Sequence, residues 1–407
     1  MTITQAVRNP VVPEADVDFH SKEFVDDPWP VYRRLRAEGT LFWHEETAQY
    51  LVTRHRECSR ILGNAETYAQ DDDFFTMLFG GLTMEGMDRP RHDDVRAIWA
   101  KDFQRVSLAD QRAMIEDVVT ARVDPYVARL KAGETADAVA GMTRGIPTLV
   151  IAHMLAIPRE RFEEFSRWSD EMGGMSEGFT RPGPRGEALL EQGRVAVRAL
   201  NSFLQDEIGK RERSEAGDLI TRMVRDPFSQ TGMTPQEVVA SNTQLVFAGN
   251  ETTAKLMAHI LYALAHHPEQ REMLRRDRQL IPGAVEEVHR WATITHRLRR
   301  IVRNGGAEIA GYEIPDGASI TCLLGSANHD DLRWERSEEL DITRQPKQHL
   351  GFGFGLHSCL GLNLARLETE IWLDRLLDEL PDWEVADVDW GTNWVLRGPL
   401  RLDLALA

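Results

Sequence analysis

The sequence predicts a mainly helical protein with small β-sheet regions towards both ends of the chain. Three observations support this fold class. Apolar residues follow helical spacing through most of residues 90–282. One segment, 234–267, is long enough for a helix of about 50 Å at 1.5 Å per residue. Short runs rich in β-branched and aromatic residues occur at 41–53 and again after residue 300.

The first part of the chain is expected to contain short elements. We expect residues 1–27 to be a loosely docked lead-in and residues 28–407 to form a single domain. The next elements are expected in this order: a helix at 31–38, a hairpin made from 41–43 and 50–53, and a helix at 54–62. Residues 63–90 show no clear periodicity and are expected to form a long loop, and such loops are usually functional.

From residue 90 onward the expected elements are mostly helices. They are expected at 91–104, 107–131, 137–156, 159–170, 186–212, 217–225, 234–267, 268–276 and 281–291. Residues 172–186 are rich in Gly and Pro and are expected to form a flexible connection. Short strands are expected at 301–302, 308–314, 319–324 and 394–406.

Composition restricts the class of protein. Of the 407 residues, 42% are hydrophobic, which suits a globular chain with a large core. The net charge of −17 argues against nonspecific binding to nucleic acid or to a membrane surface. Three cysteines are too few for a disulfide framework. No window holds the roughly 18 uninterrupted apolar residues of a membrane span, and the N-terminus lacks a signal pattern. We therefore expect a cytoplasmic protein.

The most informative segment, residues 352–361, reads FGFGLHSCLG. It places Cys359 in a glycine-rich loop that leads into an expected helix at 360–377. Glycine lets a backbone approach a flat partner closely, and a helix N-terminus stabilises a thiolate. A thiolate is also a haem-iron ligand that favours O–O cleavage. The alternative for Cys359 alone is a buried structural cysteine.

The expected long helix carries a second motif. Thr234 and Glu237 form a capping box around Pro235, and Pro268 closes the other end. The middle of the segment, residues 248–253, reads AGNETT. A small residue there lets a flat ligand lie against the backbone, and a threonine hydroxyl can bond the carbonyl four residues back. The alternative is a stretch of small residues that serves close helix packing.

Two further groups of charged residues complete the pattern. Glu287 and Arg290 are three apart, so they share a helix face and can form a charge-assisted pair. His92 and Arg96 lie four apart, and Arg299 lies nine residues after Arg290. These three residues are candidates for binding buried carboxylates. The alternative for each is a solvated surface charge, which is also the interpretation of Arg297 and Arg303.

These motifs resemble, in order and spacing, those of cytochrome P450s over roughly residues 20–405. The loop around Cys359 resembles the haem-binding loop, residues 248–253 the oxygen-binding groove, and Glu287 with Arg290 the E-x-x-R motif. The resemblance implies a soluble bacterial type of cytochrome P450 fold. It also implies haem b (iron protoporphyrin IX) between the long central helix and the cysteine-loop helix.

The resemblance assigns roles to individual residues. Cys359 would ligate the iron, Thr252 would hydrogen-bond O2 in the pocket, and Glu251 would take part in proton delivery. Glu287 and Arg290 would be structural. The residues implied to bind the cofactor are His92, Arg96, Ala248, Gly249, Arg299, Phe352, Gly353, His357, Cys359 and Gly361. Two positions depart from the family pattern: Glu339 stands where a third arginine is usual, and Asn304 replaces the acid that usually follows the position of Arg299.

The implied activity is that of a monooxygenase. It would insert one oxygen atom from O2 into a small or medium hydrophobic substrate, by hydroxylation or O-dealkylation, and aromatic or terpenoid molecules are the candidates. The substrate pocket is expected to include Phe74, Phe75, Leu78, Leu82, Leu245, Ala248, Thr293, Ile294, Val395 and Leu396.

Electrons are expected from a separate partner, because the sequence contains no flavin or iron–sulfur module. The expected partner is a ferredoxin with its reductase, or a flavodoxin. A basic patch on the cysteine face would dock it. The candidates for that patch are Lys101, Arg105, Arg112, Arg344 and Lys347.

Three other functions are compatible with the motifs. A haem-thiolate protein can bind or sense a ligand without turnover. A peroxygenase can use peroxide directly, although Glu251 and Thr252 together favour activation of O2. A cysteine-nucleophile enzyme built on Cys359 and His357 is disfavoured, because residues two apart do not share a helix face.

Overall fold

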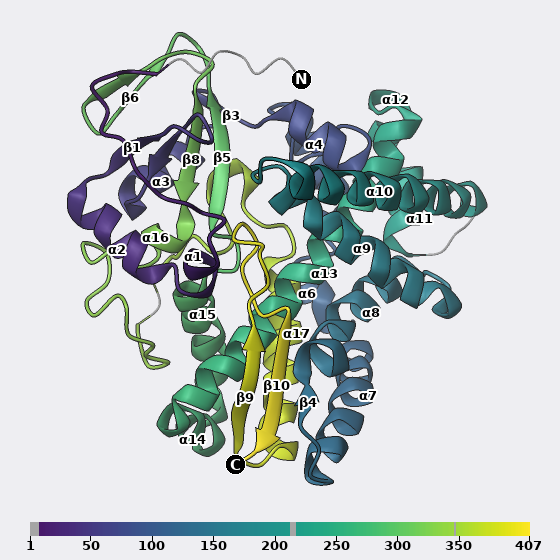
Figure 1. The fold of residues 1–407 in the computed structure, drawn as a ribbon. Coiled ribbons are helices and arrows are strands. Elements are labelled where there is room, and N and C mark those ends of the chain that lie inside the picture. The colour runs from purple at the N-terminus through teal and green to yellow at the C-terminus, as the bar shows by residue number, and fades with distance from the viewer. Residues whose placement is uncertain (1–7, 212–216, 346) are drawn as a thin grey trace.

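The computed structural model describes residues 8–211, 217–345 and 347–407, and it confirms the mainly helical prediction (Figure 1). The helices are α1 Lys22–Asp26, α2 Trp29–Glu38, α3 His55–Gly63, α4 Asp72–Phe79, α5 Arg91–Ala100, α6 Arg105–Ala109, α7 Arg112–Lys131, α8 Gly145–Met154, α9 Phe162–Gly178, α10 Pro184–Arg211, α11 Leu219–Arg225, α12 Pro227–Gly232, α13 Pro235–His266, α14 Pro268–Arg276, α15 Ile281–Ala292, α16 Leu324–Ala327 and α17 Leu362–Glu379.

Three small sheets accompany the helices. Their strands are β1 Leu41–His44, β2 Gln49–Val52, β3 Tyr68–Ala69, β4 Ala136–Asp137, β5 Arg297–Val302, β6 Ala307–Ile309, β7 Tyr312–Ile314, β8 Ser319–Leu323, β9 Trp383–Asp389 and β10 Arg401–Leu406. The largest sheet has the order β1-β2-β8-β5-β3, in which only the β2–β8 pair is parallel. The second sheet has the order β4-β10-β9, and β6 pairs with β7. The predicted hairpin at 41–53 is confirmed as β1 and β2.

Helix α13 passes through the middle of the molecule and organises the rest of the fold (Figure 1). Its capping box is present as predicted: the Thr234 side chain accepts from the N–H of Glu237, and Glu237 accepts from the N–H of Thr234. Helices α8, α9, α10, α15 and α17 all pack against it. Because α13 is long and buried over most of its length, it forms one wall of any site at the centre of the molecule.

Three predictions about local structure are wrong. The expected loop at 63–90 contains helix α4, which Asp71 caps by accepting from the N–H of Phe74. The expected connection at 172–186 is mostly helical, because α9 continues to Gly178 and α10 begins at Pro184. The tail forms strands only at β9 and β10, so residues 394–400 are a turn rather than a strand.

The glycines of the expected connection explain that error. A Cβ at Gly178 would lie 2.9 Å from the carbonyl oxygen of Gly186, so α9 and α10 approach too closely for larger side chains. Close packing of α9 against α10 therefore requires glycine, although glycine on its own disfavours a helix. This is why the sequence pattern did not predict helices here.

The lead-in is also packed more closely than expected. Residues 1–7 lie outside the described residues, but Phe19 and Phe24 are buried against Trp394 from the far end of the sequence. The backbone of Ala15 hydrogen-bonds that of Trp43. The buried side chains of this segment, which are Ala15, Val17, Phe19, Phe24 and Val25, are therefore part of the domain core.

No helix within the described ranges combines the length and apolar character needed to cross a membrane.

Candidate functional site

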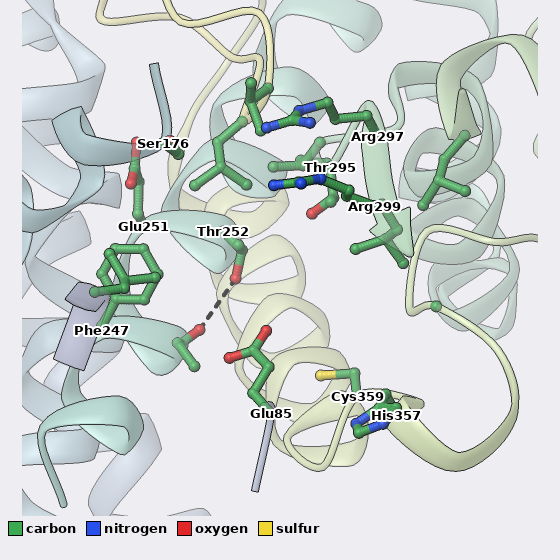
Figure 2. Close-up of a pocket in the computed structure, with 18 of the residues that line it drawn as sticks. Glu85, Ser176, Phe247, Glu251, Thr252, Thr295, Arg297, Arg299, His357 and Cys359 are labelled. Carbon is green, nitrogen blue, oxygen red and sulfur yellow. Dashed lines mark hydrogen bonds between the residues drawn. The ribbon is translucent and has the colours of Figure 1, made fainter. Parts of the chain in front are cut away.

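A cavity of about 570 Å³ lies between α13 and the loop that carries Cys359 (Figure 2). Its walls come from the α4 region, α9, α13, strand β5, the 351–361 loop and the 394–396 turn. The sequence motifs around Thr252 and Cys359, more than a hundred residues apart, therefore face the same space. This is the site that the sequence predicts.

The Cys359 loop is held by glycine conformations and a backbone hydrogen bond. Gly353 and Gly355 have φ values of 69° and 73°, in the left-handed region that favours glycine. A side chain at Gly355 would also meet the carbonyl oxygen of Leu62. The N–H of Cys359 donates to the carbonyl of Phe352 at 2.9 Å. The loop thus presents the Cys359 thiol at a fixed place on the cavity wall.

The expected thiolate stabilisation is only partly present. Helix α17 begins at Leu362, three residues after Cys359, rather than at residue 360. Burial raises the pKa of the Cys359 thiol, and a hydrogen bond from the backbone of Gly361 and the charge of Arg96 lower it by less. A bound metal cation would reverse this balance, because coordination deprotonates a thiol.

Cationic and polar groups gather beside Cys359. His92 is 1% exposed, and its ring meets the ring of His357 edge-on, with centroids 4.7 Å apart. Burial, together with the charges of Arg300, His92 and Arg96, lowers the pKa of His357 to about 2. The Nε2 atom of His357 is buried without a hydrogen-bond partner. Within the described ranges, Arg96 lines the cavity without an ion pair or hydrogen bond to protein.

These groups fit a haem. A metal-binding thiol, an unpaired guanidinium and an orphaned histidine nitrogen on one cavity wall are complementary to a flat group with a metal and two carboxylates. His92, Arg96, His357 and Cys359, all predicted as cofactor-binding, are brought together here. Phe352, Gly353 and Gly361 also line the cavity.

Strand β5 supplies a cationic residue that the sequence analysis did not select. Arg300 is 2% exposed, donates to Gln70 at 3.0 Å and acts electrostatically on His357. The predicted Arg299 also lines the cavity, but it pairs with Asp71 at 2.6 Å and donates to Ser319. Asn304 donates to the carbonyl of Glu66 and has no role at the cavity. Arg299 and Arg300 are adjacent in the sequence, and only the fold shows that it is the charge of Arg300 that acts on His357.

Helix α13 contributes the predicted groove residues. Ala248, Gly249, Glu251 and Thr252 line the cavity. The Thr252 hydroxyl donates to the carbonyl of Ala248 at 3.3 Å (Figure 2). A Cβ at Gly249 would contact Ile151 of α8 at 3.4 Å, so this glycine also permits close helix packing.

Glu251 does not face water. Its Oε1 accepts from Lys255 Nζ at 2.5 Å, and Lys255 also donates to the carbonyl of Leu396. Its Oε2 is buried without a hydrogen-bond partner, directly against Gly173 of α9. One turn earlier on α9, burial raises the pKa of Asp170 to about 6, with Glu251 adding to the increase. Asp170 is thus a second carboxyl that the charge of Glu251 affects, and it lies 3.6 Å from Arg144, a partly exposed side chain.

Most of the predicted substrate residues line the cavity. These are Phe74, Phe75, Leu78, Leu245, Ala248, Ile294, Val395 and Leu396. Two predictions are wrong. Leu82 is packed in the apolar core outside the cavity lining. Thr293 has a φ of 46°, donates to the carbonyl of Arg290 and accepts from Asn328, so it is a buried structural residue.

Three polar side chains of the cavity were not foreseen. Glu85 accepts from Gln244 of α13 at 3.1 Å, and burial raises its pKa. Glu368 of α17 is 2% exposed, and burial raises its pKa well above the usual value. Arg297, interpreted from the sequence as a surface charge, points into the cavity (Figure 2). Sequence patterns give no signal for these residues, because the cavity is formed by segments distant in the chain.

The predicted Glu287–Arg290 pair is present and buried. Arg290 donates to both oxygens of Glu287, at 2.7 and 2.8 Å, and the two side chains are 2% and 5% exposed. Arg344 donates to Glu287 at 2.9 Å and supplies the third cationic partner. By sequence, Glu339 aligns with the position of the usual arginine; in the structure the arginine is Arg344, five residues further along the loop. Arg344 therefore belongs to this cluster and not to a surface patch.

Comparisons with known proteins agree with this site. Residues 195–387 match a family model described as cytochrome P450. The mycinamicin IV hydroxylase/epoxidase of Micromonospora griseorubida is 30% identical over 367 residues, which cover 87% of this chain and 88% of that protein. The vitamin D3 dihydroxylase of Streptomyces griseolus is 29% identical over 89% of this chain and 86% of its own. The structure of P450BioI in complex with acyl carrier protein ligated to hexadec-9Z-enoic acid is 26% identical. It has a TM-score of 0.86 over 95% of this chain and 100% of its own.

Proposed function

Since the chain belongs to the cytochrome P450 family and is a P450 monooxygenase, we propose that the cavity between α13 and the Cys359 loop binds haem b and a hydrophobic substrate. The reaction is insertion of one oxygen atom from O2, by hydroxylation or O-dealkylation. The observation that carries this proposal is that the Cys359 thiol and the Thr252 hydroxyl line one cavity. Beside them, within the described ranges, Arg96 makes no hydrogen bond or ion pair and the Nε2 atom of His357 has no hydrogen-bond partner.

Particular residues would hold the cofactor. Cys359 would ligate the iron, and His92, Arg96, His357 and Arg300 would bind the two carboxylates of the haem. When bound, a thiolate-ligated haem supplies an electron-rich iron that favours cleavage of the O–O bond. The protein contributes a buried site that excludes bulk water and fixed donors that need no rearrangement during the reaction.

Glu251 and Thr252, on the cavity wall opposite the Cys359 loop, would deliver protons to the cavity. The Thr252 hydroxyl donates to a carbonyl of its own helix and can turn to donate into the cavity instead. Glu251 holds one oxygen on Lys255 and leaves the other unsatisfied near Asp170. We propose that protons enter by way of Asp170 and Glu251, two buried carboxyls that interact electrostatically. This route favours use of O2 over direct use of peroxide.

Replacing Glu251 with glutamine is expected to lower product formation on the order of 10²-fold, the usual contribution of a positioned proton-transfer group. Gly173→Ala should give a smaller loss in the same direction, since its methyl group would overlap Oε2 of Glu251 and displace the carboxylate. The measurement is product formed per O2 consumed.

The matched control is Gly174→Ala on the same helix. Its methyl group would meet only a terminal carbon of Leu189, at 3.3 Å, which can move aside. If Gly173→Ala and Gly174→Ala give the same yield, the position of the Glu251 carboxylate is not important for proton delivery.

Electrons would come from a separate donor, for which we propose a ferredoxin with its reductase, or a flavodoxin. Lys101, Arg105 and Arg112 are exposed on and around α6 and the start of α7. Helix α6 packs against α17, the helix that follows Cys359. These side chains therefore place positive charge close to the Cys359 side of the cavity, where an acidic donor would dock.

Charge reversal of this patch, as Arg105→Glu or Arg112→Glu, is expected to slow reduction by a [2Fe–2S] ferredoxin several-fold at low salt. The effect should shrink as salt rises, because exposed charges are screened beyond about 10 Å at 0.1 M. Stopped-flow reduction measures it. Arg198→Glu, an exposed arginine on α10, serves as the control. Equal rates for Arg105→Glu and Arg198→Glu would show that the donor docks elsewhere.

The proposed function is tested by the absorption spectrum of the purified protein after reduction and exposure to carbon monoxide. A strongly red-shifted Soret band is expected from haem with an intact thiolate ligand. Absence of any haem band after expression with added haem would refute the proposal. Product formation that needs O2 and a redox partner identifies a monooxygenase. Product formation with peroxide alone would identify a peroxygenase, and no turnover under either condition would identify a ligand sensor.

A further inference from the structure

Arg297 places an unpaired positive charge in the cavity. Within the described ranges its guanidinium makes no hydrogen bond and no ion pair, and its Nε is buried without an acceptor. Its one recorded partner is the ring face of Trp394, 5.7 Å from the guanidinium carbon. Figure 2 shows the side chain reaching from β5 into the cavity, away from Cys359 and His357.

Within the described ranges, none of the acidic side chains that line the same cavity pairs with Arg297, and this includes Glu46 and Glu368. Asp71 pairs with Arg299 at 2.6 Å, Glu251 with Lys255 at 2.5 Å, and Glu85 accepts from Gln244 at 3.1 Å. Burial lowers the pKa of Arg297 to about 9, with the charge of Arg299 adding to the decrease. A cation without a counterion in an apolar enclosure is unfavourable. The arrangement is complementary to an anion that the protein itself does not supply.

The carboxylates of the haem are not a good match for Arg297. The charges that act on His357, beside Cys359, are those of Arg300, His92 and Arg96. Arg297 is absent from that group, and the one charge that affects its own pKa is Arg299. Arg297 lies over the ring of Trp394 and apart from Cys359 and His357 (Figure 2), so it belongs to a different part of the cavity, on the substrate side.

We propose that the substrate is an apolar carboxylic acid whose carboxylate binds Arg297, an inference that rests on the proposed function. A guanidinium offers a planar pair of N–H donors that match a carboxylate. The surrounding Trp394, Val395, Leu396 and Ile294 provide an apolar wall for the rest of the molecule. With the acid group held at Arg297, the opposite end of the substrate extends towards Thr252 and the Cys359 side, where oxygen is inserted.

The test compares acids with their uncharged counterparts. Dodecanoic, 4-ethylbenzoic and geranic acids are each paired with their primary amides, which have nearly the same shape but no charge. Binding to the haem-loaded protein is measured by calorimetry and by the shift of the Soret band. We expect at least one acid to bind about tenfold or more tighter than its amide, as for a charge-assisted hydrogen bond.

Variants assign that preference to the side chain. Arg297→Gln should abolish the preference for the acid while changing amide affinity by less than about threefold, and Arg297→Lys should retain part of it because the charge remains. Arg303→Gln, which removes an exposed arginine just after the same strand, is the matched control and should bind as the wild type does.

Haem content separates the two sources of carboxylate. If Arg297→Gln loses haem and no acid preference exists in the wild type, Arg297 binds a haem carboxylate and the inference is overturned. If the thiolate band is intact and no acid is preferred, the inference fails while the proposed function stands. If no thiolate band forms in the wild type, the proposed function fails, and calorimetry still reports whether Arg297 selects acids.

Discussion

Replacing Cys359 with serine is expected to abolish the red-shifted Soret band of the reduced, carbon monoxide-exposed protein and to remove monooxygenase activity. Serine keeps the loop geometry, since the N–H of residue 359 still donates to the carbonyl of Phe352. It lacks the thiolate, and the electron donation that favours O–O cleavage is lost with it. We expect any haem that binds to give a spectrum without the thiolate signature.

The chain offers a matched control for this substitution. Cys58 and Cys322 are also free and buried, but they lie in the core of the β-sheet region, outside the cavity lining. Burial, with the neighbouring Cys322, raises the pKa of Cys58 well above the usual value, so it is an inert thiol. Cys58→Ala should retain the full band. A Cys359→Ser protein that keeps the band, or a Cys58→Ala protein that loses it, would contradict the assignment of Cys359.

The sequence predicted those parts of the site that depend on local motifs. The loop around Cys359, the capping box at Thr234 and the cavity positions of Glu251 and Thr252 all follow from short patterns with a fixed backbone geometry. In the structure Cys359, Glu251 and Thr252 line one cavity, and the capping box at Thr234 is present. The structure of such a motif can be predicted from sequence because its residues interact with neighbours only a few positions away.

Residues that act across the fold could not be predicted in the same way. Arg297, Arg299 and Arg300 are nearly indistinguishable in sequence. Within the described ranges, however, Arg297 is unpaired in the cavity, Arg299 pairs with Asp71, and Arg300 donates to Gln70 and affects the pKa of His357. Which face of β5 each occupies depends on the neighbouring strands β8 and β3. The glycines of α9 misled the analysis for a related reason, because their value lies in contacts with Glu251 and with α10.

The buried cluster of Glu287, Arg290 and Arg344 gives the largest expected effect on stability. Among the residues that the structure describes, Glu287 is the only carboxylate that pairs with Arg290 or Arg344, and it also accepts from the N–H of Asp341. Glu287→Gln would leave both arginines without an anionic partner. Breaking a buried pair from one side typically reduces the free energy of unfolding by about 3–5 kcal/mol. We expect a matching fall in the urea midpoint of the haem-loaded protein.

Comparing Arg344→Gln with Glu339→Gln tests which residue completes the cluster. Arg344 is 12% exposed and donates both to Glu287 and to the carbonyls of Glu335, Arg336 and Glu339. In the described part of the chain the Glu339 side chain pairs only with the exposed Arg336, and exposed pairs contribute about 0–1 kcal/mol. Arg344→Gln should therefore lower the midpoint clearly, by less than Glu287→Gln because Arg290 still pairs with Glu287. If Arg344→Gln is as mild as Glu339→Gln, the third partner contributes nothing, and the Glu287–Arg290 pair alone holds the core behind the Cys359 loop.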